Sequence, residues 1–499
     1  MALHYTSELP IDLYRAADVR ELDRLAIHEH GIPGFDLMSR AGLAAFSLLR
    51  AQWPEASRIA IVCGTGNNGG DGYVVASLAL QAGLQPQIWQ VGDANRIQGD
   101  ALTARRRALE EGVDIRPFSG EALQGDVIVD ALLGTGLSGE VRGELARAIA
   151  AINASAVPVL AIDIPSGLCA DSGSVLGDAV RAACTITFIG MKQGLLTGMA
   201  PDHCGDLYYA RLDVPDAVFA AVPVASRQVK QEHIARWLPP RPRHAHKGHH
   251  GHVLIIGGDH GMGGAAAMAA EAAGRVGAGL VTVVTRPEHV SAILARRPEC
   301  MVLATTDLGE LLQRVTVLVA GPGLGQGEWG QSLLRQALAS SLPLVLDADA
   351  LNLLAHWHDQ GDPLARRGNW ILTPHPGEAA RLLGCSTVNI QRDRFDSVRR
   401  LQTQYAAVAV LKGNGSLIAG PSGDLWLSAT GNPGMASGGM GDVLSGVIGG
   451  LLAQGLTPLE AAAAGVWLHG NAADEAARDG ERGLLATDLM TGLRHGVNP

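Results

Sequence analysis

A glycine-rich stretch with a single carboxylate lies near the end of the chain. Residues 430–446 read TGNPGMASGGMGDVLSG, and an apolar helix pattern follows them. Glycines let the backbone approach a ligand, and the free N–H groups of a helix's first turn bind anions. A carboxylate beside a bound phosphate can take the proton of a substrate hydroxyl that attacks phosphorus. We therefore interpret Asp442 as a catalytic residue of a phosphoryl-transfer site; the alternative is a tight turn with Asp442 as its N-cap.

A second glycine turn lies shortly before the first. Residues 408–416 read VAVLKGNGS, a buried type of strand that ends in a turn with Lys412 and Asn414. A lysine and several backbone amides at the carboxyl end of a strand form a cradle for phosphates. This turn is our candidate for binding nucleotide phosphates.

The first half of the chain has a glycine loop of its own. The apolar run RIAIVC at residues 58–63 leads into GTGNNGGDG at residues 64–72, and a helix is predicted to begin at Tyr73. This order of strand, glycine turn and helix opens a Rossmann-like unit. The acidic residue of an NAD fingerprint is missing at the usual spacing, the nearest candidate being Asp93. The loop offers Asn67, Asn68 and Asp71 instead, which could hold a ligand or a cation.

Two later strands end in carboxylates. DVIVDA at residues 126–131 contains Asp130, and VLAIDI at residues 159–164 contains Asp163 shortly before Ser166. The carboxyl ends of parallel strands meet at one edge of a sheet, so these residues and Asn68 are expected near one another. Oxygen ligands without His or Cys suit a hard cation, K⁺ or Mg²⁺. The alternative is that both aspartates only cap loops.

The chain is long enough for two domains. It has 499 residues, 47% of them apolar and only 4% aromatic, a balance that suits closely packed α/β layers. After two predicted helices at 16–29 and 35–50, strands and helices alternate, and a low-pattern stretch at 213–229 reads as a linker. A second series then starts at VLIIGG, with strands predicted at 253–258, 315–320, 342–348 and 370–372. We predict two α/β domains with mostly parallel sheets, at residues 1–222 and 223–499.

Charge and hydropathy argue against several functional classes. The net charge is −10 and no Lys/Arg block stands out, which disfavours a nucleic-acid surface. The sequence predicts no membrane-spanning segment and no apolar signal region, so a cytoplasmic location is expected. The histidine-rich stretch HAHKGHHGH at residues 244–252 lacks interleaved acidic or cysteine partners, and we do not interpret it as a metal site.

The motifs in this order resemble one family over nearly the whole chain. GTGNNGGDG, DALLGTGLSG and DIPSG are similar to the epimerase domain of the bifunctional NAD(P)H-hydrate repair enzymes. GHVLIIGG, GPGLG, TPHPGE, KGNGS and SGGMGDVLSG are similar to their ADP/ATP-dependent dehydratase domain. The resemblance implies a Rossmann-like N-terminal domain that interconverts the R and S hydrates of NADH and NADPH. It implies a ribokinase-like C-terminal domain that dehydrates the S hydrate and consumes ADP, with ATP as the possible alternative.

The resemblance also implies roles for particular residues. Asp163 is the candidate for proton transfer in epimerisation, and Asn68, Asp130 and Ser166 would bind K⁺. The first site would hold the hydrate through Asn67, Asn68, Gly69, Gly70, Asp71, Gly134, Thr135, Gly136, Leu137, Ser138, Gly139, Glu140 and Asp163. The second site would hold the hydrate through Ala265, Gly325, His375 and Asp442. The nucleotide would contact Lys412, Gly413, Asn414, Gly415, Ser416 and Gly441, with Mg²⁺ as a cofactor.

Two other readings are compatible with parts of the chain. A ribokinase-like kinase of a vitamin precursor, fused to a cofactor-binding domain, would use the same phosphate chemistry but release a stable phosphoester. A non-enzymatic N-terminal binding module is the second alternative, and Asn68, Asp130 and Asp163 argue against it. The expected partners are small molecules, neither nucleic acid nor membrane, and the chain is expected to be a homo-oligomer.

Overall fold

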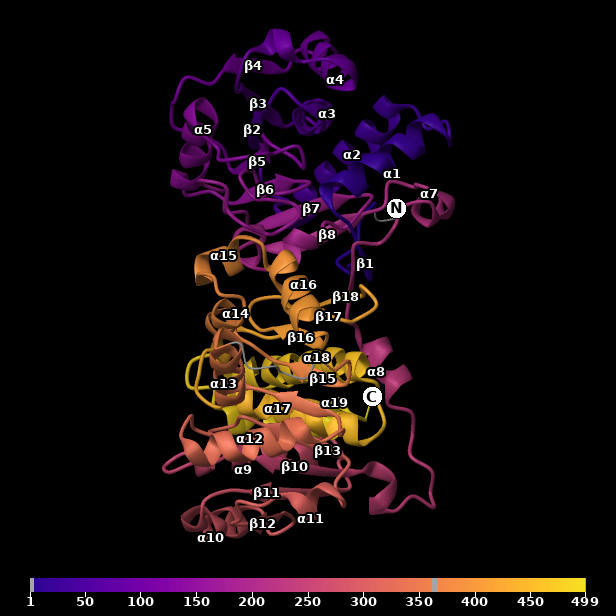
Figure 1. The fold of residues 1–499 in the computed structure, drawn as a ribbon. Helices are drawn as coiled ribbons and strands as arrows, with labels where there is room; N and C mark the ends of the chain where they lie inside the picture. Colours follow the sequence, from indigo (N-terminus) through magenta and orange to yellow (C-terminus); the bar gives the residue numbers. More distant parts are fainter. Residues whose placement is uncertain (1–3, 361–366, 499) are drawn as a thin grey trace. The chain divides into compact units, whose positions relative to one another are not determined.

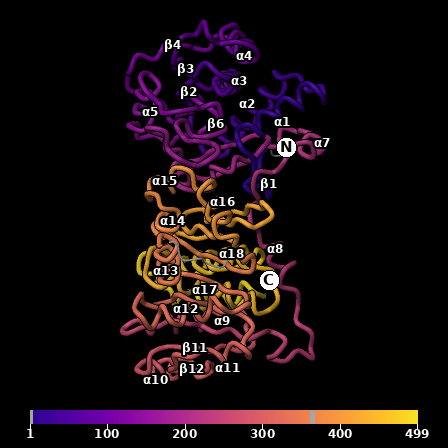
Figure 2. Tube along the Cα trace, in the orientation of Figure 1, coloured from indigo at the N-terminus to yellow at the C-terminus, as the bar shows by residue number. Residues whose placement is uncertain are grey.

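The computed structural model describes residues 4–360 and 367–498. Its contacts divide the chain into two compact units, Met1–Arg227 and Gln228–Pro499. Figure 1 shows each unit as strands flanked by helices, and Figure 2 follows the same chain as a tube. The predicted class, two α/β units with parallel sheets, is confirmed.

The sheet of the first unit is parallel throughout, in the order β4-β3-β2-β5-β6-β7-β8. The strand order reverses between β2 and β5, and ligands of open parallel sheets bind at such a switch point. The strand bounds are β2 (Arg58–Cys63), β3 (Gln85–Gln90), β4 (Asp114–Pro117), β5 (Val127–Ala131), β6 (Val159–Ile162), β7 (Cys184–Phe188) and β8 (Asp206–Ala210).

Helices cover both faces of this sheet. Along β2, Ile59 and Ile61 pack in the core with α1 to α4, whereas Ala60 and Val62 pack in the core with α5. This alternation is the side-chain period of a strand buried on both faces. The helices are α1 (Ala16–His28), α2 (Gly34–Gln52), α3 (Asn67–Gln81), α4 (Gly99–Glu110), α5 (Gly143–Ala154), α6 (Pro201–Cys204) and α7 (Asp216–Ala220), with short 3-10 turns η1 (Ala94–Arg96) and η2 (Gln193–Leu196).

The sheet of the second unit is parallel from β12 to β16, and β17 and β18 extend it antiparallel. Its order β18-β17-β16-β15-β14-β13-β10-β11-β12 reverses between β10 and β13, which places the second switch point there. The strand bounds are β10 (His252–Ile256), β11 (Leu280–Val284), β12 (Met301–Leu303), β13 (Val317–Ala320), β14 (Leu344–Leu346), β15 (Trp370–Leu372), β16 (Val408–Leu411), β17 (Ser416–Ala419) and β18 (Leu425–Ser428).

One large core in the second unit joins α9, α17, α18 and α19 to one face of the sheet. Helices α9 and α17 approach very closely, because a methyl group on Gly446 would lie 2.1 Å from the Ala269 carbonyl oxygen. The helices are α8 (Gln231–Trp237), α9 (Gly263–Arg275), α10 (Pro287–Arg296), α11 (Gly309–Leu312), α12 (Glu328–Ala339), α13 (Ala348–Asp359), α14 (Pro376–Leu382), α15 (Thr387–Arg392), α16 (Arg394–Tyr405), α17 (Met440–Ala453), α18 (Pro458–Ala476) and α19 (Leu489–Gly496). The 3-10 turns are η3 (Lys247–His250), η4 (Pro433–Met435), η5 (Ala477–Asp479) and η6 (Ala486–Asp488).

Several predicted boundaries were wrong. Helix α3 begins at Asn67 rather than Tyr73, and α17 begins at Met440 rather than after Gly446. In both cases glycines that suggested a loop form the first turns of a helix, where their lack of a side chain allows close packing. Strand β14 ends at Leu346, because α13 already starts at Ala348.

The stretch predicted as a featureless linker is partly ordered. It contains α7 and the short strand β9 (Ser226–Gln228), which pairs antiparallel with β1 (Asp12–Leu13). The predicted boundary at 222/223 therefore falls between α7 and β9.

Candidate functional site

A cavity of about 900 Å³ opens at the switch point of the first unit. It lies at the carboxyl ends of β2, β5, β6 and β7, and the first turn of α3 forms part of its wall. The predicted site residues that line it are Asn67, Asn68, Asp71, Gly134, Thr135, Gly136, Leu137, Ser138 and Asp163.

Four predicted binding residues are not part of this wall. Gly69 is buried below it, where a methyl group would meet the Gly64 carbonyl oxygen at 2.3 Å, and Gly70 packs against Met38. Gly139 and Glu140 follow the lining loop, and Glu140 forms an exposed ion pair with Arg142. Gly69 and Gly70 are therefore placed to shape the backbone rather than to touch a ligand.

A compact group of oxygen atoms lies between β5 and the loop after β6. Asp130 is fully buried, and it accepts hydrogen bonds from the Ser166 hydroxyl (2.6 Å) and the Ser166 N–H (2.8 Å). Burial raises the pKa of Asp130 to about 6, and the bonds from Ser166 and Leu132 offset only part of this effect. The Asn68 amide donates to the Leu133 carbonyl at 2.9 Å.

One oxygen of this group lacks a partner. Asn68 Oδ1 is buried and accepts no hydrogen bond from the described part of the chain. A buried, unsatisfied acceptor beside a buried carboxylate is the environment that a cation would stabilise. Asn68, Asp130 and Ser166 thus fit a cation held by oxygen atoms.

Asp163 adopts an unusual backbone conformation at the floor of the cavity. Its φ is +67°, in the left-handed region that is uncommon for residues other than glycine. Its carboxylate forms an ion pair with Lys192, whose side chain is only 1% exposed. The sequence analysis missed Lys192 and also Asp23 of α1, which lines the same cavity. Local motifs could not reveal them, because they come from elements distant from the glycine loop.

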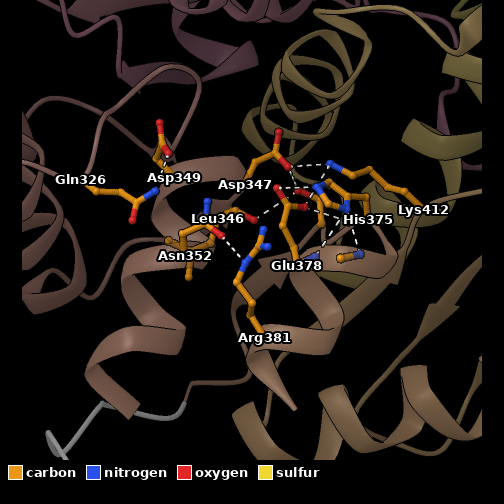
Figure 3. A network of polar contacts seen from close by, with 11 residues as sticks. Gln326, Leu346, Asp347, Asp349, Asn352, His375, Glu378, Arg381 and Lys412 are labelled. Carbon is orange, nitrogen blue, oxygen red and sulfur yellow. Dashed lines mark hydrogen bonds and ion pairs between the residues drawn. The ribbon is translucent and has the colours of Figure 1, made fainter. Parts of the chain in front are cut away.

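The second candidate site lies at the carboxyl ends of β14, β15 and β16. Lys412, directly after β16, donates to Asp347 Oδ1 at 2.8 Å and lies 3.9 Å from Glu378 Oε2 (Figure 3). The Thr373 hydroxyl also donates to Asp347, at 2.9 Å. Burial alone would lower the pKa of Lys412, yet the carboxylates of Asp347 and Glu378 raise it, so the ammonium stays charged.

Asp442 occupies the third position of α17. The N-cap is Gly439, so the alternative reading of Asp442 as an N-cap was wrong. Burial raises the pKa of Asp442 to about 7, and the negative charges of Asp347, Asp349 and Glu378 outweigh the positive charge of Lys412. A carboxylate with a pKa near neutrality is suited to proton transfer.

The predicted binding residues of this site come from several loops. The His375 ring is about half exposed, and its Nδ1 accepts from the Gly377 N–H at 3.0 Å (Figure 3). The Gly325 N–H donates to Asp349 at 2.9 Å. Ala265 lies in the first turn of α9, beside the Gly323 turn. A separate cavity of about 960 Å³ borders these loops and is lined by Gln326, Asn352, Gly377 and Arg381 among others.

The KGNGS turn connects β16 to β17. Gly413 (φ +139°) and Gly415 (φ +61°) supply the positive φ angles that this turn requires, and a buried arginine binds its carbonyl oxygens. The Arg394 guanidinium donates to the carbonyl oxygens of Leu411, Lys412 and Gly415 at 3.3–3.4 Å. The sequence analysis missed Arg394, because an arginine in an amphipathic helix usually faces solvent. Gly441 lies close to Lys412, since a methyl group there would be 3.2 Å from Nζ.

A histidine beneath the site was also missed. His469 of α18 is buried, and its Nε2 has no hydrogen-bond partner within residues 4–360 and 367–498. Burial lowers the pKa of His469 to about 4, and the Lys412 charge adds to this effect, so its ring is neutral.

Within the same described ranges, no group of three or more His, Cys, Asp or Glu side chains could hold a metal, the histidine-rich stretch at 244–252 included. No helix found there is long and apolar enough to cross a membrane.

Comparisons with known proteins cover both units. The family model described as NAD(P)H-hydrate dehydratase matches residues 253–494, and the model described as YjeF-related protein N-terminus matches residues 34–194. A bifunctional NAD(P)H-hydrate repair enzyme Nnr from Coxiella burnetii is 53% identical, over 98% of this chain and 99% of its own length. The enzyme of the same name from Escherichia coli is 46% identical, over 98% of this chain and 95% of its own length.

A solved structure resembles the second unit. A ribokinase-like superfamily protein from Enterococcus faecalis aligns with a TM-score of 0.51 at 31% identity, covering 55% of this chain and 96% of its own. This likeness confirms the ribokinase-like fold that was expected for the C-terminal domain.

The raised pKa of Asp442 predicts a pH-dependent stability. The unfolded carboxyl titrates near 3.8 and the folded one near 7, so ionised Asp442 destabilises the ligand-free fold increasingly from about pH 4 to pH 7. Asp442→Asn should remove this destabilisation, so it should raise the free energy of unfolding of the second unit more at pH 8 than at pH 5. The gain at pH 8 should exceed the gain at pH 5 by on the order of 1–3 kcal/mol, since one pKa unit corresponds to about 1.4 kcal/mol.

Denaturant unfolding of wild type and variant at both pH values measures this difference. Glu310→Gln, which removes an exposed carboxylate, is the matched control and should show no such pH dependence. An equal gain for Asp442→Asn at pH 5 and pH 8 would show that the Asp442 carboxylate is not electrostatically strained.

Proposed function

Since the chain belongs to the family of bifunctional NAD(P)H-hydrate repair enzymes, we propose that it repairs hydrated NADH and NADPH. The epimerase activity is assigned to residues 1–222 and the dehydratase activity to residues 223–499. The observation that supports the proposal is that each unit has its own group of carboxylates at the carboxyl edge of its own sheet, one around Asp163 and one around Asp442.

Dehydration requires a better leaving group than hydroxide. Phosphorylation of the hydroxyl supplies one, and Asp442 would take the hydroxyl proton as the oxygen attacks phosphorus. A pKa of about 7 supports this role, because roughly half of the Asp442 carboxyls are ionised at neutral pH and the ionised form is a stronger base than an ordinary carboxylate. The S hydrate would contact Ala265, Gly325, His375 and Asp442.

The phosphoryl donor is proposed to be ADP, with ATP as the alternative. Lys412 to Ser416 and Gly441 would hold its phosphates, and the Arg394 contacts support the shape of this turn. The described carboxylates around Lys412 do not form a metal cage by themselves, so Mg²⁺ would be held by the nucleotide phosphates together with one or two of these carboxylates. When bound, Mg²⁺ would neutralise charge on the transferring phosphoryl group.

Epimerisation is proposed to use Asp163 for proton transfer, in the cavity lined by Asn67, Asp71 and the 134–138 loop. The hydrates of NADH and NADPH are the small-molecule substrates of both sites. A cytoplasmic homo-oligomer stays our expectation.

The two activities should separate by mutation. Asp442→Asn should lower dehydration of the S hydrate by about 10²–10⁴-fold and leave epimerisation intact, because the base is lost in one unit only. Asp163→Asn should lower epimerisation and leave dehydration of the S hydrate intact. Epimerisation is followed by chromatography of the R and S forms without ADP, and dehydration by the return of reduced-nicotinamide absorbance with ADP and Mg²⁺.

Glu310→Gln serves as the control and should retain both activities. Loss of both activities in a folded Asp442→Asn protein would refute the separation. A stable phosphoester accumulating in the wild type would point to the vitamin-precursor kinase instead.

Epimerisation should also depend on a monovalent cation. Asn68 Oδ1, Asp130 and Ser166 are proposed to hold K⁺, and the partnerless Asn68 oxygen supports this assignment. Replacing K⁺ by tetramethylammonium, which is too large for the group, should reduce epimerisation about tenfold or more, as the loss of one bound charge in a buried site implies. An epimerisation rate that is unchanged in tetramethylammonium and in Asp130→Asn would exclude a cation there.

A further inference from the structure

Lys192 is buried with all its hydrogen-bonding capacity used inside the protein. Its ammonium donates to the Asp163 carboxylate, to the Thr187 hydroxyl at 3.0 Å and to the Phe188 carbonyl at 3.0 Å. An ammonium group has three N–H donors, so none is left for a ligand. Lys192 is therefore placed to act on the reaction by holding Asp163 rather than by donating a hydrogen bond to a ligand.

These contacts orient the two Asp163 oxygens differently. Oδ1 receives the Lys192 ammonium, and the Thr187 hydroxyl and the Phe188 N–H lie 3.4 Å from it. Oδ2 faces the 134–138 loop, since a methyl group on Gly134 would lie 3.8 Å from it. One oxygen is thus anchored, and the other is presented toward the wall of the cavity.

Two more carboxyl groups share this cavity. Asp71 reaches it from α3 and Asp23 from α1. The charged groups that face Asp71 are Asp163 after β6, Asp23 and Lys192 after β7. Burial, followed by the Asp163 and Asp23 charges, holds the pKa of Asp71 well above its usual range, and burial raises that of Asp23 to about 6. Burial and the neighbouring carboxylates thus favour the protonated form of Asp71.

We propose that Asp71 is the second acid–base residue of the epimerase site, paired with Asp163, and that Lys192 is the positioning residue that holds Asp163 Oδ1 so that Oδ2 faces the cavity. This inference rests on the proposed epimerase function and deepens it, because it names the partner that a single carboxylate lacks. Asp71 and Asp163 line the same cavity from different elements, α3 and the loop after β6, and a reaction on two faces of one carbon needs two such groups.

The proton balance follows from the chemistry of the hydrate. Water adds to an enamine double bond of the reduced ring, so the hydroxyl stands on the carbon beside the ring nitrogen. As the C–O bond breaks, its electron pair leaves on oxygen, Asp71 gives that oxygen a proton, and the nitrogen lone pair forms C=N⁺. Water then forms a C–O bond on the opposite face while Asp163 accepts its proton, and the nitrogen regains its lone pair. The reverse conversion returns the proton from Asp163 to Asp71. Between turnovers, proton exchange with water restores the starting protonation states of both carboxyls.

Two variants of the full chain test the proposal. Asp71→Asn replaces a protonated carboxyl by an amide of the same shape, so folding is expected to be retained. Its kcat for epimerisation without ADP should fall about 10²-fold or more with KM nearly unchanged. Lys192→Met should lower kcat similarly with KM nearly unchanged, because Asp163 Oδ1 loses the ammonium that holds it in place.

The second unit supplies an internal control. Dehydration of the pure S hydrate with ADP should be unchanged in both variants, and Lys247→Met, at an exposed lysine of η3, should leave epimerisation unchanged. Epimerisation by Asp71→Asn within about threefold of wild type would overturn the role of Asp71, because an acid–base residue contributes far more. An unchanged kcat in folded Lys192→Met would reduce Lys192 to a structural residue. If Lys192→Met does not fold, Asp71→Asn alone decides the carboxyl pair. A wild type that does not interconvert the epimers at all would instead refute the epimerase function.

Discussion

A carboxylate that is buried without enough positive charge around it must take up a proton or attract a cation, and both sites of this chain depend on that constraint. Around Asp442, three further carboxylates face the single Lys412, and the pKa of Asp442 rises to about 7. In the first unit, the partners of buried Asp130 are hydrogen-bond donors rather than cations. Asp71, Asp23 and Asp163 all lie near the same positive charge, that of Lys192. The same physical imbalance underlies both of the sites that we propose, one for phosphoryl transfer and one for proton exchange.

The parallel sheets explain how such groups come together. Each strand delivers the residue after its carboxyl end to one edge, so Asp163 follows β6, Asp347 follows β14 and Lys412 follows β16. Glycines in α3 and α17 let these helices pack closely, α3 against the turn after β2 and α17 against α9. A methyl group on Gly69 would meet the Gly64 carbonyl at 2.3 Å, and one on Gly446 the Ala269 carbonyl at 2.1 Å. The glycine content of the motifs is therefore needed for packing as much as for contact with a ligand.

The sequence was sufficient for the α/β class and the two-unit division. It also predicted that Asn68, Asp130 and Ser166 lie at one edge of the sheet, where the structure has them, and their binding of a cation stays a prediction. It was not sufficient for residues that enter a site from other elements. Lys192, Asp23 and Arg394 carry no local signature, because an isolated charged residue in a helix or loop is usually solvated. The helix starts at Asn67 and Met440 were missed for a different reason: glycine has low helix propensity, and tertiary packing overrides it here.

The most direct test of the account is the recovery of reduced-nicotinamide absorbance from a mixture of R and S hydrates, with K⁺ and Mg²⁺ present and with or without ADP. Two cooperating sites predict recovery of the whole mixture with ADP, at a rate above that of spontaneous epimerisation, and none without a nucleotide. Recovery that stops at the S fraction would contradict an epimerase in the first unit. No recovery with either ADP or ATP would contradict the central claim that Asp442 and Lys412 form a hydrate-dehydrating site.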